Sequence, residues 1–390
     1  MSVKVNHLSP LASPTPTFVV WVYQFFCRKS PLSLFNPGFL SRSTCQIDSY
    51  SDEDMANVIM TRVKALSLFS GGLDSILATK LILDQDIEVV ALNFTSQFNP
   101  IEKGKNKVAE AANQLGIRLQ LINLESDYVH LIRNPKHGYG KNINPCIDCR
   151  IFMLKKAKQY AREIGASFIF TGEVLDERPL SQRFNALKIV EKESGLEGKL
   201  LRPLSAKLLP KTMAEKKGLV DREKLAGIRG RSRKPQIKLA KESGIDYYPS
   251  PAGGCLLTCE DYAHKLRDLF KHKKRFSMRD VDLLRVGRHF RLGPNKIIVG
   301  RNKEENQTLT AKKASTDYYF EVATIPGPTT VLQGTKSREA IETAAALTAY
   351  YSDSKDLEVT VKYGKDQLDK SITVSTLNDT DIENLRIGEN

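Results

Sequence analysis

The sequence predicts an α/β fold, a Rossmann-like parallel sheet with helices on both faces, followed by a smaller α+β domain. Between residues 64 and 172, apolar runs short enough for buried strands alternate with segments whose apolar residues recur at helical spacing. A turn with two consecutive glycines joins the first of these strands to the first helix. From about residue 276, short strand-like runs and turns replace the alternation, which predicts the second domain.

Composition limits the classes of protein to which the chain can belong. The 390 residues suffice for two or three cores, and 41% apolar with 27% charged residues is typical of a soluble globular protein. The net charge of +14 favours a polyanionic partner, nucleic acid before membrane. No run reaches the ~18 apolar residues of a membrane span, so we expect no membrane partner and a cytoplasmic location. Six cysteines in so long a chain do not indicate a disulfide scaffold.

Residues 1–60 do not have the pattern of a core. They are rich in Ser and Pro, have no acidic residue before Asp48 and contain one short apolar run, residues 18–27. A disordered transit peptide, a signal segment and a start codon assigned too far upstream all fit this pattern. We favour the last, with Met55 or Met60 as the first residue, because the first strand begins directly after Met60.

The first elements form a βαβ unit over residues 64–94. A buried strand is expected over residues 65–69 and a second over residues 88–94, with a helix between them. The start of that helix presents unpaired backbone N–H groups and a partial positive charge. Two glycines let a ligand approach this backbone, so the turn suits a phosphate group. Two consecutive glycines alone would more often mark a tight connection between a strand and a helix than a phosphate site.

The complete turn is more specific than its glycines. Its sequence, SGGLDS, resembles the SGGxDS signature of the PP-loop ATP pyrophosphatases, and it has neither the GxxxxGK[ST] nor the GxGxxG pattern. The resemblance implies the HUP-like (adenine nucleotide alpha hydrolase-like) fold, with ATP and Mg²⁺ as cofactors. In that family the loop holds the pyrophosphate end of ATP while AMP is joined to an oxygen of the substrate. The nucleotide-binding positions that we carry over or place at neighbouring strand ends are Ser70, Gly71, Gly72, Asp74, Ser75, Asn93, Phe94, Gly172 and Glu173, and Asp74 is the catalytic residue among them.

The remaining elements of this domain follow in order. A helix is expected over residues 105–115, a strand over residues 117–124, and a loop over residues 144–150 that enters a helix at residues 151–164. A strand at residues 167–171 ends at Gly172. Because ligands bind at the carboxyl ends of parallel strands, the glycine turn and Gly172 are expected at one site.

A second resemblance narrows the function. TGEVLDERPLSQR (residues 171–183) and the later RPL (residues 202–204) resemble the PP-loop domain of the 4-thiouridine synthetases, the ThiI family, over roughly residues 64–272. The resemblance implies insertion of sulfur into tRNA. The chain departs from the family pattern at Asp176-Glu177, where Gly-Gln is expected.

Two basic segments favour RNA as the partner. Residues 227–241 carry six Lys or Arg side chains; such a run is usually a solvated face, but here it leads towards Cys255 and also suits a phosphate backbone. Residues 289–306 resemble an NFACT-R-like RNA-binding domain, whose strands and Ala-rich helix we place within residues 276–378. We expect the first domain to span residues 61–273 and residues 379–390 to be a frayed tail.

The cysteines supply the second half of the chemistry. Cys146 and Cys149 form a CxxC at a predicted helix start, where the helix dipole would lower a thiol pKa, and Cys255 follows a second glycine pair. The three positions resemble those of iron–sulfur tRNA thiolases, in which three thiolates hold a [4Fe–4S] cluster. A persulfide on Cys255 without a cluster, with Cys149 as a second catalytic thiol, and a closed zinc site that includes Cys259 are the alternatives.

The sequence therefore predicts an ATP-dependent tRNA sulfurtransferase that adenylates a uridine carbonyl oxygen and replaces it with sulfur, with 4-thiouridine as the expected product. Sulfide or a cysteine desulfurase persulfide is the expected sulfur donor, and the sequence leaves a homodimer open. One rival is a PP-loop ligase that adenylates a small carboxylate or amide. The other is a non-catalytic RNA-binding protein regulated by a nucleotide.

Overall fold

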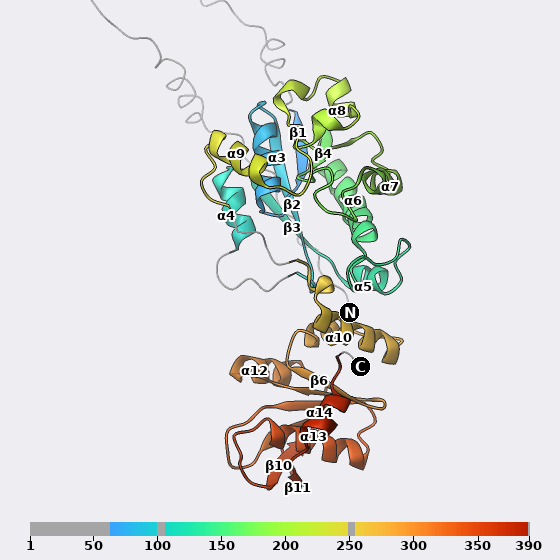
Figure 1. Ribbon diagram of the computed structural model, residues 1–390, viewed down its shortest axis with the longest axis vertical. Helices are drawn as coiled ribbons and strands as arrows, with labels where there is room; N and C mark the ends of the chain where they lie inside the picture. Colours follow the sequence, from blue (N-terminus) through green and yellow to red (C-terminus); the bar gives the residue numbers. More distant parts are fainter. Residues whose placement is uncertain (1–62, 100–105, 249–253, 389–390) are drawn as a thin grey trace, which may run out of the picture. The chain divides into compact units, whose positions relative to one another are not determined.

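A parallel sheet of five strands organises the first part of the computed structural model, which describes residues 63–99, 106–248 and 254–388 (Figure 1). Its strand order is β3-β2-β1-β4-β5, and every neighbouring pair is parallel. The strands are β1 (Lys64–Leu68), β2 (Glu88–Thr95), β3 (Arg118–Asn123), β4 (Phe168–Thr171) and β5 (Leu200–Leu201). The predictions for residues 1–60 lie outside the described residues.

The order of the strands reverses between β1 and β4. The chain runs outward from β1 to β3 and then returns to place β4 on the other side of β1. In open α/β sheets the crevice at such a reversal, beyond the carboxyl ends of the strands, is where ligands bind. The glycine turn after β1 and Gly172 after β4 both lie at this point.

Helices cover both faces of the sheet because successive strand residues point to opposite sides. Ala65 belongs to one hydrophobic cluster and Leu66 to another. The first cluster is covered by α3 (Leu73–Leu83), α4 (Lys107–Gln114) and α9 (Lys234–Glu242), and the second by α6 (Cys146–Glu163) and α7 (Phe184–Ser194) (Figure 1). The predicted α/β architecture is confirmed.

Helix α6 begins five residues before the predicted start. The segment expected as a loop is its first turn, with Pro145 as the residue before it. Asp148 is buried in that turn and accepts hydrogen bonds from the backbone N–H groups of Lys136 (3.1 Å) and His137 (3.0 Å). This carboxylate ties the preceding loop to the helix, and Ile147 already packs on the sheet. Both cysteines of the CxxC are therefore helical.

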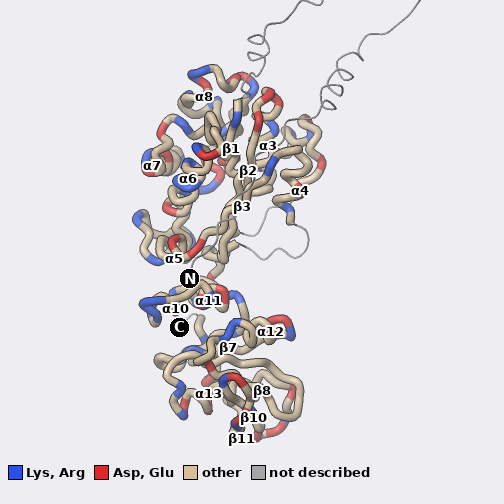
Figure 2. Tube along the Cα trace, turned by 180° about the vertical axis from the view of Figure 1, so that it is seen from behind, with Lys and Arg blue, Asp and Glu red and all other residues tan. Residues whose placement is uncertain are grey.

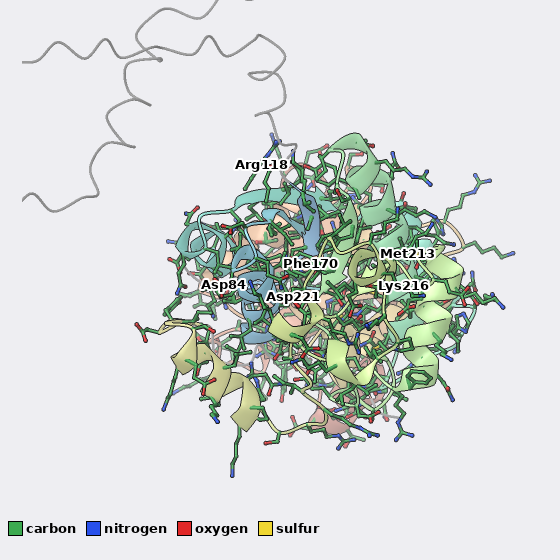
Figure 3. The ribbon with its side chains drawn as sticks, turned by 90° about the horizontal axis from the view of Figure 1, so that it is seen from above. Asp84, Arg118, Phe170, Met213, Lys216 and Asp221 are labelled. Atoms are coloured by element: carbon green, nitrogen blue, oxygen red, sulfur yellow. The ribbon has the colours of Figure 1, made fainter. Side chains whose placement is uncertain are left out.

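Short helices cover the amino ends of the strands, at the end of the sheet opposite the glycine turn. They are η1 (Ala206–Leu208), α8 (Met213–Lys216) and η2 (Arg222–Lys224). Figure 3 looks onto this end, where Asp84 at the end of α3, Arg118 at the start of β3 and Met213 on α8 are labelled. The carboxyl ends of the strands, and the glycine turn, lie on the other side.

A third cluster joins α5 (Ser126–Arg133) to helices from later in the chain. Phe98, Tyr128 and Ile132 pack with side chains of α10 (Glu260–His272) and α11 (Met278–Leu283). The boundary proposed near residue 273 thus lies within one hydrophobic cluster, because Val281 and Leu284 are part of it. In the described part of the chain, no helix has the length and apolarity to cross a bilayer.

The C-terminal domain is an antiparallel sheet of six strands. Its order is β11-β10-β8-β9-β7-β6, and it packs on α13 (Arg338–Tyr350). The strands are β6 (Arg288–Leu292), β7 (Asn295–Val299), β8 (Tyr318–Val322), β9 (Thr330–Gln333), β10 (Glu358–Gly364) and β11 (Lys370–Ser375), with α12 (Lys303–Lys312) between β7 and β8. The predicted α+β character is confirmed.

The end of the chain corrects one prediction. The polar residues expected to fray contain α14 (Asp379–Leu385), which is capped by the side chain of Asn378. Ile382 is buried in the core of the domain and Leu385 packs against the same cluster, so two apolar residues dock this polar helix.

Candidate active site

The glycine turn presents the bare start of helix α3. Gly72 precedes the helix, and no side chain caps its first turn. The turn is braced from within by the Ser75 hydroxyl, which donates to the Gly72 carbonyl at 2.8 Å, and from β2 by the Asn93 amide, which donates to the Phe69 carbonyl at 2.8 Å. Uncapped N–H groups at the start of a helix form a site for an anion such as a phosphate.

Two glycines of the site are required by close packing. Gly71 has φ +72°, and a Cβ there would lie 2.9 Å from the Cα of Val108 on α4. Gly172 approaches the start of α3 so closely that a Cβ would lie 2.6 Å from the Ser75 nitrogen. The end of β4 and the start of α3 are thus in direct backbone contact, which is possible because Gly172 has no side chain.

A cavity of about 150 Å³ lies at this junction. Its lining residues come from the glycine turn, the end of β4, α6 and the loop after β4: Ser70, Asp74, Ser75, Arg150, Thr171, Gly172, Glu173, Glu177, Arg178 and Gln182. Seven of the nine predicted nucleotide-binding residues line this cavity or belong to the turn, and the remaining two, Asn93 and Phe94, line a neighbouring cavity.

Asp74 is placed to receive a cation or a hydrogen-bond donor. Its Oδ1 atom is buried without a hydrogen-bond partner in the described part of the chain. Burial raises the pKa of this carboxyl, and Arg233 and Arg178 only partly oppose the effect. Gln236 on α9 is fully buried, and its side chain also opposes the rise in the Asp74 pKa. Neither the amide oxygen nor the amide nitrogen of Gln236 has a hydrogen-bond partner in the described part of the chain. Such orphaned buried atoms fit a site completed by a bound ligand and its metal ion.

Glu173, predicted as a nucleotide-binding residue, contacts other side chains of the protein in the structure. It is buried, and it accepts hydrogen bonds from Arg202 Nε (3.0 Å) and the Thr171 hydroxyl (3.0 Å), with Arg150 Nη1 3.6 Å away. Burial would raise the pKa of Glu173, but Arg150 and Arg202 hold it below its ordinary value. A carboxylate engaged in this way positions two guanidinium groups, and direct contact with a nucleotide stays a prediction.

The loop after β4 accounts for the departure at Asp176. Asp176 has φ +61°, a left-handed conformation that favours glycine, and its carboxylate accepts a hydrogen bond from Arg229 at 2.7 Å. Asp tolerates this conformation better than most residues. The loop is closed by the Asp176 N–H, which donates to the Gln182 carbonyl at 2.9 Å. Asp176 therefore holds a backbone conformation that a glycine would adopt without strain.

The three predicted cysteine ligands meet at a second cavity of about 240 Å³. Cys146 and Cys149 come from the first turn of α6, and Cys255 comes from the segment before η3 (Leu256–Thr258). Neighbours of the CxxC and residues distant from it in sequence complete the wall: Leu68, Phe69, Ser70, Leu92, Asn93, Phe94, Asn144, Arg150, Met153, Arg178 and Ser181. Cys255 lies against Phe98, with its sulfur 3.6 Å from the Phe98 carbonyl oxygen.

The thiols are less acidic than the sequence suggested. Burial raises the pKa of Cys146 and Cys149, and it raises that of Cys255 to about 11. Desolvation of the thiolate thus outweighs the expected effect of the helix start. Tyr128 partly counters this at Cys149, because its hydroxyl oxygen lies 2.9 Å from the sulfur. A bound metal would supply the positive charge that these thiols lack.

The two cavities share a wall. Leu68, Ser70, Arg150 and Arg178 line both of them. Ser70 begins the glycine turn, and Arg150 directly follows Cys149. The nucleotide side and the cysteine side are therefore adjacent compartments of one site, separated by a hydroxyl and two guanidinium groups. Sequence reasoning missed both arginines; the one available signal was the position of Arg150 beside the CxxC.

Cys259 lies apart from the other three cysteines. It is exposed, it does not line the cysteine cavity, and it precedes α10. Within residues 63–99, 106–248 and 254–388, no three His, Cys, Asp or Glu side chains are grouped to hold a single metal ion. A [4Fe–4S] cluster needs a different arrangement of ligands, because each thiolate binds a separate iron atom. Three thiols on the wall of one cavity fit that group.

Comparisons with known proteins agree with the two-part architecture. Residues 60–208 match the family "Thiamine biosynthesis protein (ThiI)", and residues 287–386 match the "NFACT protein RNA binding domain". Both resemblances predicted from the sequence are confirmed over these residues. The described structure carries the glycine turn and the CxxC within the first match and the antiparallel sheet largely within the second.

Curated relatives resemble the first part of the chain. The "Probable tRNA sulfurtransferase" of Thermococcus kodakarensis is 30% identical over 151 residues, 37% of this chain and 38% of the relative. The "tRNA-specific 2-thiouridylase MnmA" of Sulfurimonas denitrificans is 30% identical over 118 residues, 29% of this chain and 35% of the relative. The chain thus spans little more than a third of the length of these relatives.

A solved structure titled "Crystal structure of a 4-thiouridine synthetase - RNA complex with bound ATP" is 20% identical, with a TM-score of 0.33. The match covers 57% of this chain and 52% of that chain. So distant a likeness adds nothing to the assignment of function.

Proposed function

We propose that this chain is an ATP-dependent tRNA sulfurtransferase that adenylates a uridine carbonyl oxygen and replaces that oxygen with sulfur. The observation that carries the proposal is the wall shared by the two cavities at Ser70, Arg150 and Arg178. Thiolation needs an activating nucleotide and a sulfur-bearing centre at the same carbon. Here the phosphate-binding turn and three cysteines face adjacent spaces.

On the nucleotide side, the N–H groups at the start of α3 hold the pyrophosphate end of ATP, since no side chain caps them. Asp74, with an unpartnered oxygen, holds Mg²⁺ at the same end. The guanidinium groups of Arg150 and Arg178 stabilise negative charge on the phosphates as AMP is transferred. Loss of AMP then becomes the easy step, because the uridine oxygen leaves as part of a phosphate ester.

On the cysteine side, Cys146, Cys149 and Cys255 hold a [4Fe–4S] cluster, which when bound supplies an iron position for incoming sulfide. Tyr128 orients the Cys149 sulfur, and the apolar wall of Phe94 and Met153 keeps water from the reacting carbon. Zinc and a persulfide on Cys255 are the alternatives. The exposed position of Cys259 supports the set of three thiols over a closed set of four.

RNA is the proposed substrate because residues 287–386 match an RNA-binding domain and the chain carries a net charge of +14. Sulfide or a cysteine desulfurase persulfide is the proposed donor, and a cytoplasmic location stays a prediction, as does a homodimer. The product is proposed to be 4-thiouridine. A second candidate is 2-thiouridine, because a 2-thiouridylase is as similar to this chain as the sulfurtransferase is.

One assay separates this function from its rivals. The purified chain should convert ATP to AMP and diphosphate only with tRNA present, and mass spectrometry of the tRNA nucleosides should show which thiouridine is formed. Turnover that needs a small carboxylate or amide instead of tRNA would identify a different ligase. Nucleotide binding without any turnover would identify a regulated RNA-binding protein. Binding of tRNA should weaken with salt, with a slope of ~0.7–0.9 per neutralised phosphate.

A further inference from the structure

A small basic cavity lies outside the candidate active site, where α10 meets the sheet of the C-terminal domain. Its volume is about 60 Å³, and it is lined in part by His272, Lys273, Arg291, Lys296 and Gln333. Four of these five side chains are basic. The four basic residues come from the end of α10, from β6 and from β7, and Figure 2 shows Lys and Arg positions on α10 and beside β7.

Lys296 is the member of this group with the weakest partner, a long ion pair to Asp268. Its side chain lies on β7 and the residue is only 6% exposed. Its ammonium is 3.9 Å from Oδ2 of Asp268, beyond hydrogen-bonding distance, and no hydrogen bond from it is found in the described part of the chain. Burial lowers the pKa of Lys296 to about 7. A buried ammonium that has one long ion pair and no hydrogen bond is costly, so its presence needs a reason.

The carboxylate beside Lys296 is already used by another cation. Arg291 donates to both oxygens of Asp268, with Nε 2.9 Å from Oδ1 and Nη2 on Oδ2. The His272 ring lies 3.1 Å from the same carboxylate. Asp268 is therefore shared by three basic side chains, and the bidentate guanidinium of Arg291 is its strongest partner.

The other neighbouring carboxylate is also engaged. Asp280, at the start of α11, accepts a hydrogen bond from Lys273 at 2.8 Å and caps the helix through Ser277. Two carboxylates thus face the ammonium or guanidinium groups of Lys273, Arg291 and Lys296, with His272 as a fourth basic group. Four basic side chains around the cavity therefore share two carboxylates.

The size and polarity of the cavity restrict what can neutralise it. A cavity needs about 10–15 Å³ to hold a single water, so 60 Å³ accommodates roughly four waters or one tetrahedral oxyanion. Lys296 offers ammonium donors, and Gln333, its register partner on the neighbouring strand β9, lines the cavity beside it. A nucleoside or an amino acid would not fit, and a single phosphate group would.

We propose that this cavity binds one phosphate group, and that the group belongs to the backbone of the RNA substrate. The source in RNA rests on the proposed function, whereas the phosphate chemistry rests on the residues alone. The site places one fixed backbone contact at the junction between α10 and β7. A contact of this kind positions an RNA without reading its sequence.

The test compares the full-length chain with Lys296→Met, with Lys296→Gln as a second variant, and with Lys362→Met as the matched control. Lys362 is an exposed lysine of β10, in the same domain and away from the cavity. Binding of inorganic phosphate is measured by calorimetry in phosphate-free buffer. Binding of total tRNA is measured by fluorescence anisotropy over a range of salt concentrations. Any phosphate bound at the glycine turn is common to all four proteins and cancels in the comparison.

We expect both Lys296 variants to bind one phosphate fewer per chain than the wild type, while Lys362→Met binds as the wild type does. Their tRNA affinity should fall on the order of tenfold, with a salt slope smaller by ~0.7–0.9. Loss of phosphate with unchanged tRNA binding would overturn the RNA source and leave a site for free phosphate. Unchanged binding of both ligands would overturn the proposal.

The same proteins distinguish this inference from the proposed function. If the wild type binds phosphate at Lys296 yet never forms AMP with tRNA, the sulfurtransferase assignment fails and the phosphate site stands. If AMP and thiouridine are formed equally by wild type and Lys296 variants at every tRNA concentration, the site contributes nothing to substrate binding and its RNA source is overturned.

Discussion

The hydroxyl of Tyr128 lies 2.9 Å from the sulfur of Cys149, which couples helix α5 to the CxxC at the start of α6. Tyr128 is buried between Phe98 and Phe152, so its ring is held by packing and its hydroxyl has a fixed direction. A hydrogen bond to a thiolate stabilises the charged form. The contact therefore favours the thiolate at a thiol whose burial disfavours it.

Tyr128→Phe should preserve the fold and make Cys149 less reactive. The substitution keeps the ring and removes only the hydroxyl, so the pKa of the Cys149 thiol should rise further. Alkylation of Cys149 by iodoacetamide, followed by peptide mass spectrometry at constant pH, should slow several-fold, while Cys259 serves as an exposed internal reference. Equal rates in the two proteins would show that the contact has no influence on the thiol.

Asp74→Asn should abolish AMP formation and leave the protein at least as stable. Burial raises the pKa of Asp74, which means that its charge is destabilising above that pKa and is tolerated for function. Asp84→Asn is the matched control, because Asp84 lies at the other end of α3, away from the cavity (Figure 3). AMP turnover and thermal unfolding decide the outcome; normal turnover in Asp74→Asn would refute the PP-loop assignment.

The sequence predicted the parts of the site that are formed by residues close together in the chain. The turn at Ser70, its glycines and the CxxC each lie within a few residues, next to a strand or helix with clear periodicity. The parallel sheet with helices on both faces also follows from the alternation of strands and helices. These are the elements in which local pattern and global fold agree.

The rest of the site depends on contacts between distant segments. Glu173 meets Arg202 from the end of β5 and Arg150 from α6, and Asp74 meets Arg233 and Gln236 from α9. The local sequence pattern of one segment does not predict which residues of a distant segment it contacts. The pKa of the cysteines was mispredicted for the same reason, since the sequence shows a helix start but not the burial that surrounds it.

Glu173→Gln should destabilise the fold by about 3 kcal/mol, because it leaves Arg150 with a neutral partner in the interior and Arg202 with Glu191 as its one charged partner among the described residues. The sign of the pH dependence follows from the lowered pKa of Glu173. Its contribution is present above the ordinary carboxyl pKa of about 4.3 and is lost as the pH falls through the folded-state value. Denaturant unfolding at pH 7 and at acidic pH measures both.

Glu177→Gln is the matched control for Glu173. It lies in the same loop and lines the same cavity, but burial and the nearby Asp74 raise its pKa. Its charge is therefore destabilising, and its removal should leave the free energy of unfolding unchanged or increase it. Equal destabilisation by the two variants would show that the arginine pair contributes nothing specific.

The cysteines give the sharpest prediction. If Cys146, Cys149 and Cys255 hold a [4Fe–4S] cluster, anaerobically purified protein should be brown and contain about four irons per chain. Replacing any one of the three by Ala should lose iron and thiolation together. Cys259→Ala should lose neither, because this thiol is exposed and outside the cavity.

The comparison of Cys255→Ala with Cys259→Ala decides between the open and closed sites. Both residues flank η3, so the two substitutions disturb the same short segment, and only the cavity distinguishes them. Equal loss of metal in the two variants, or zinc in the wild type, would exclude a cluster held by three thiols. Wild-type protein that forms thiouridine without any metal would instead favour sulfur transfer through a persulfide on Cys255, which lines the same cavity as Arg178.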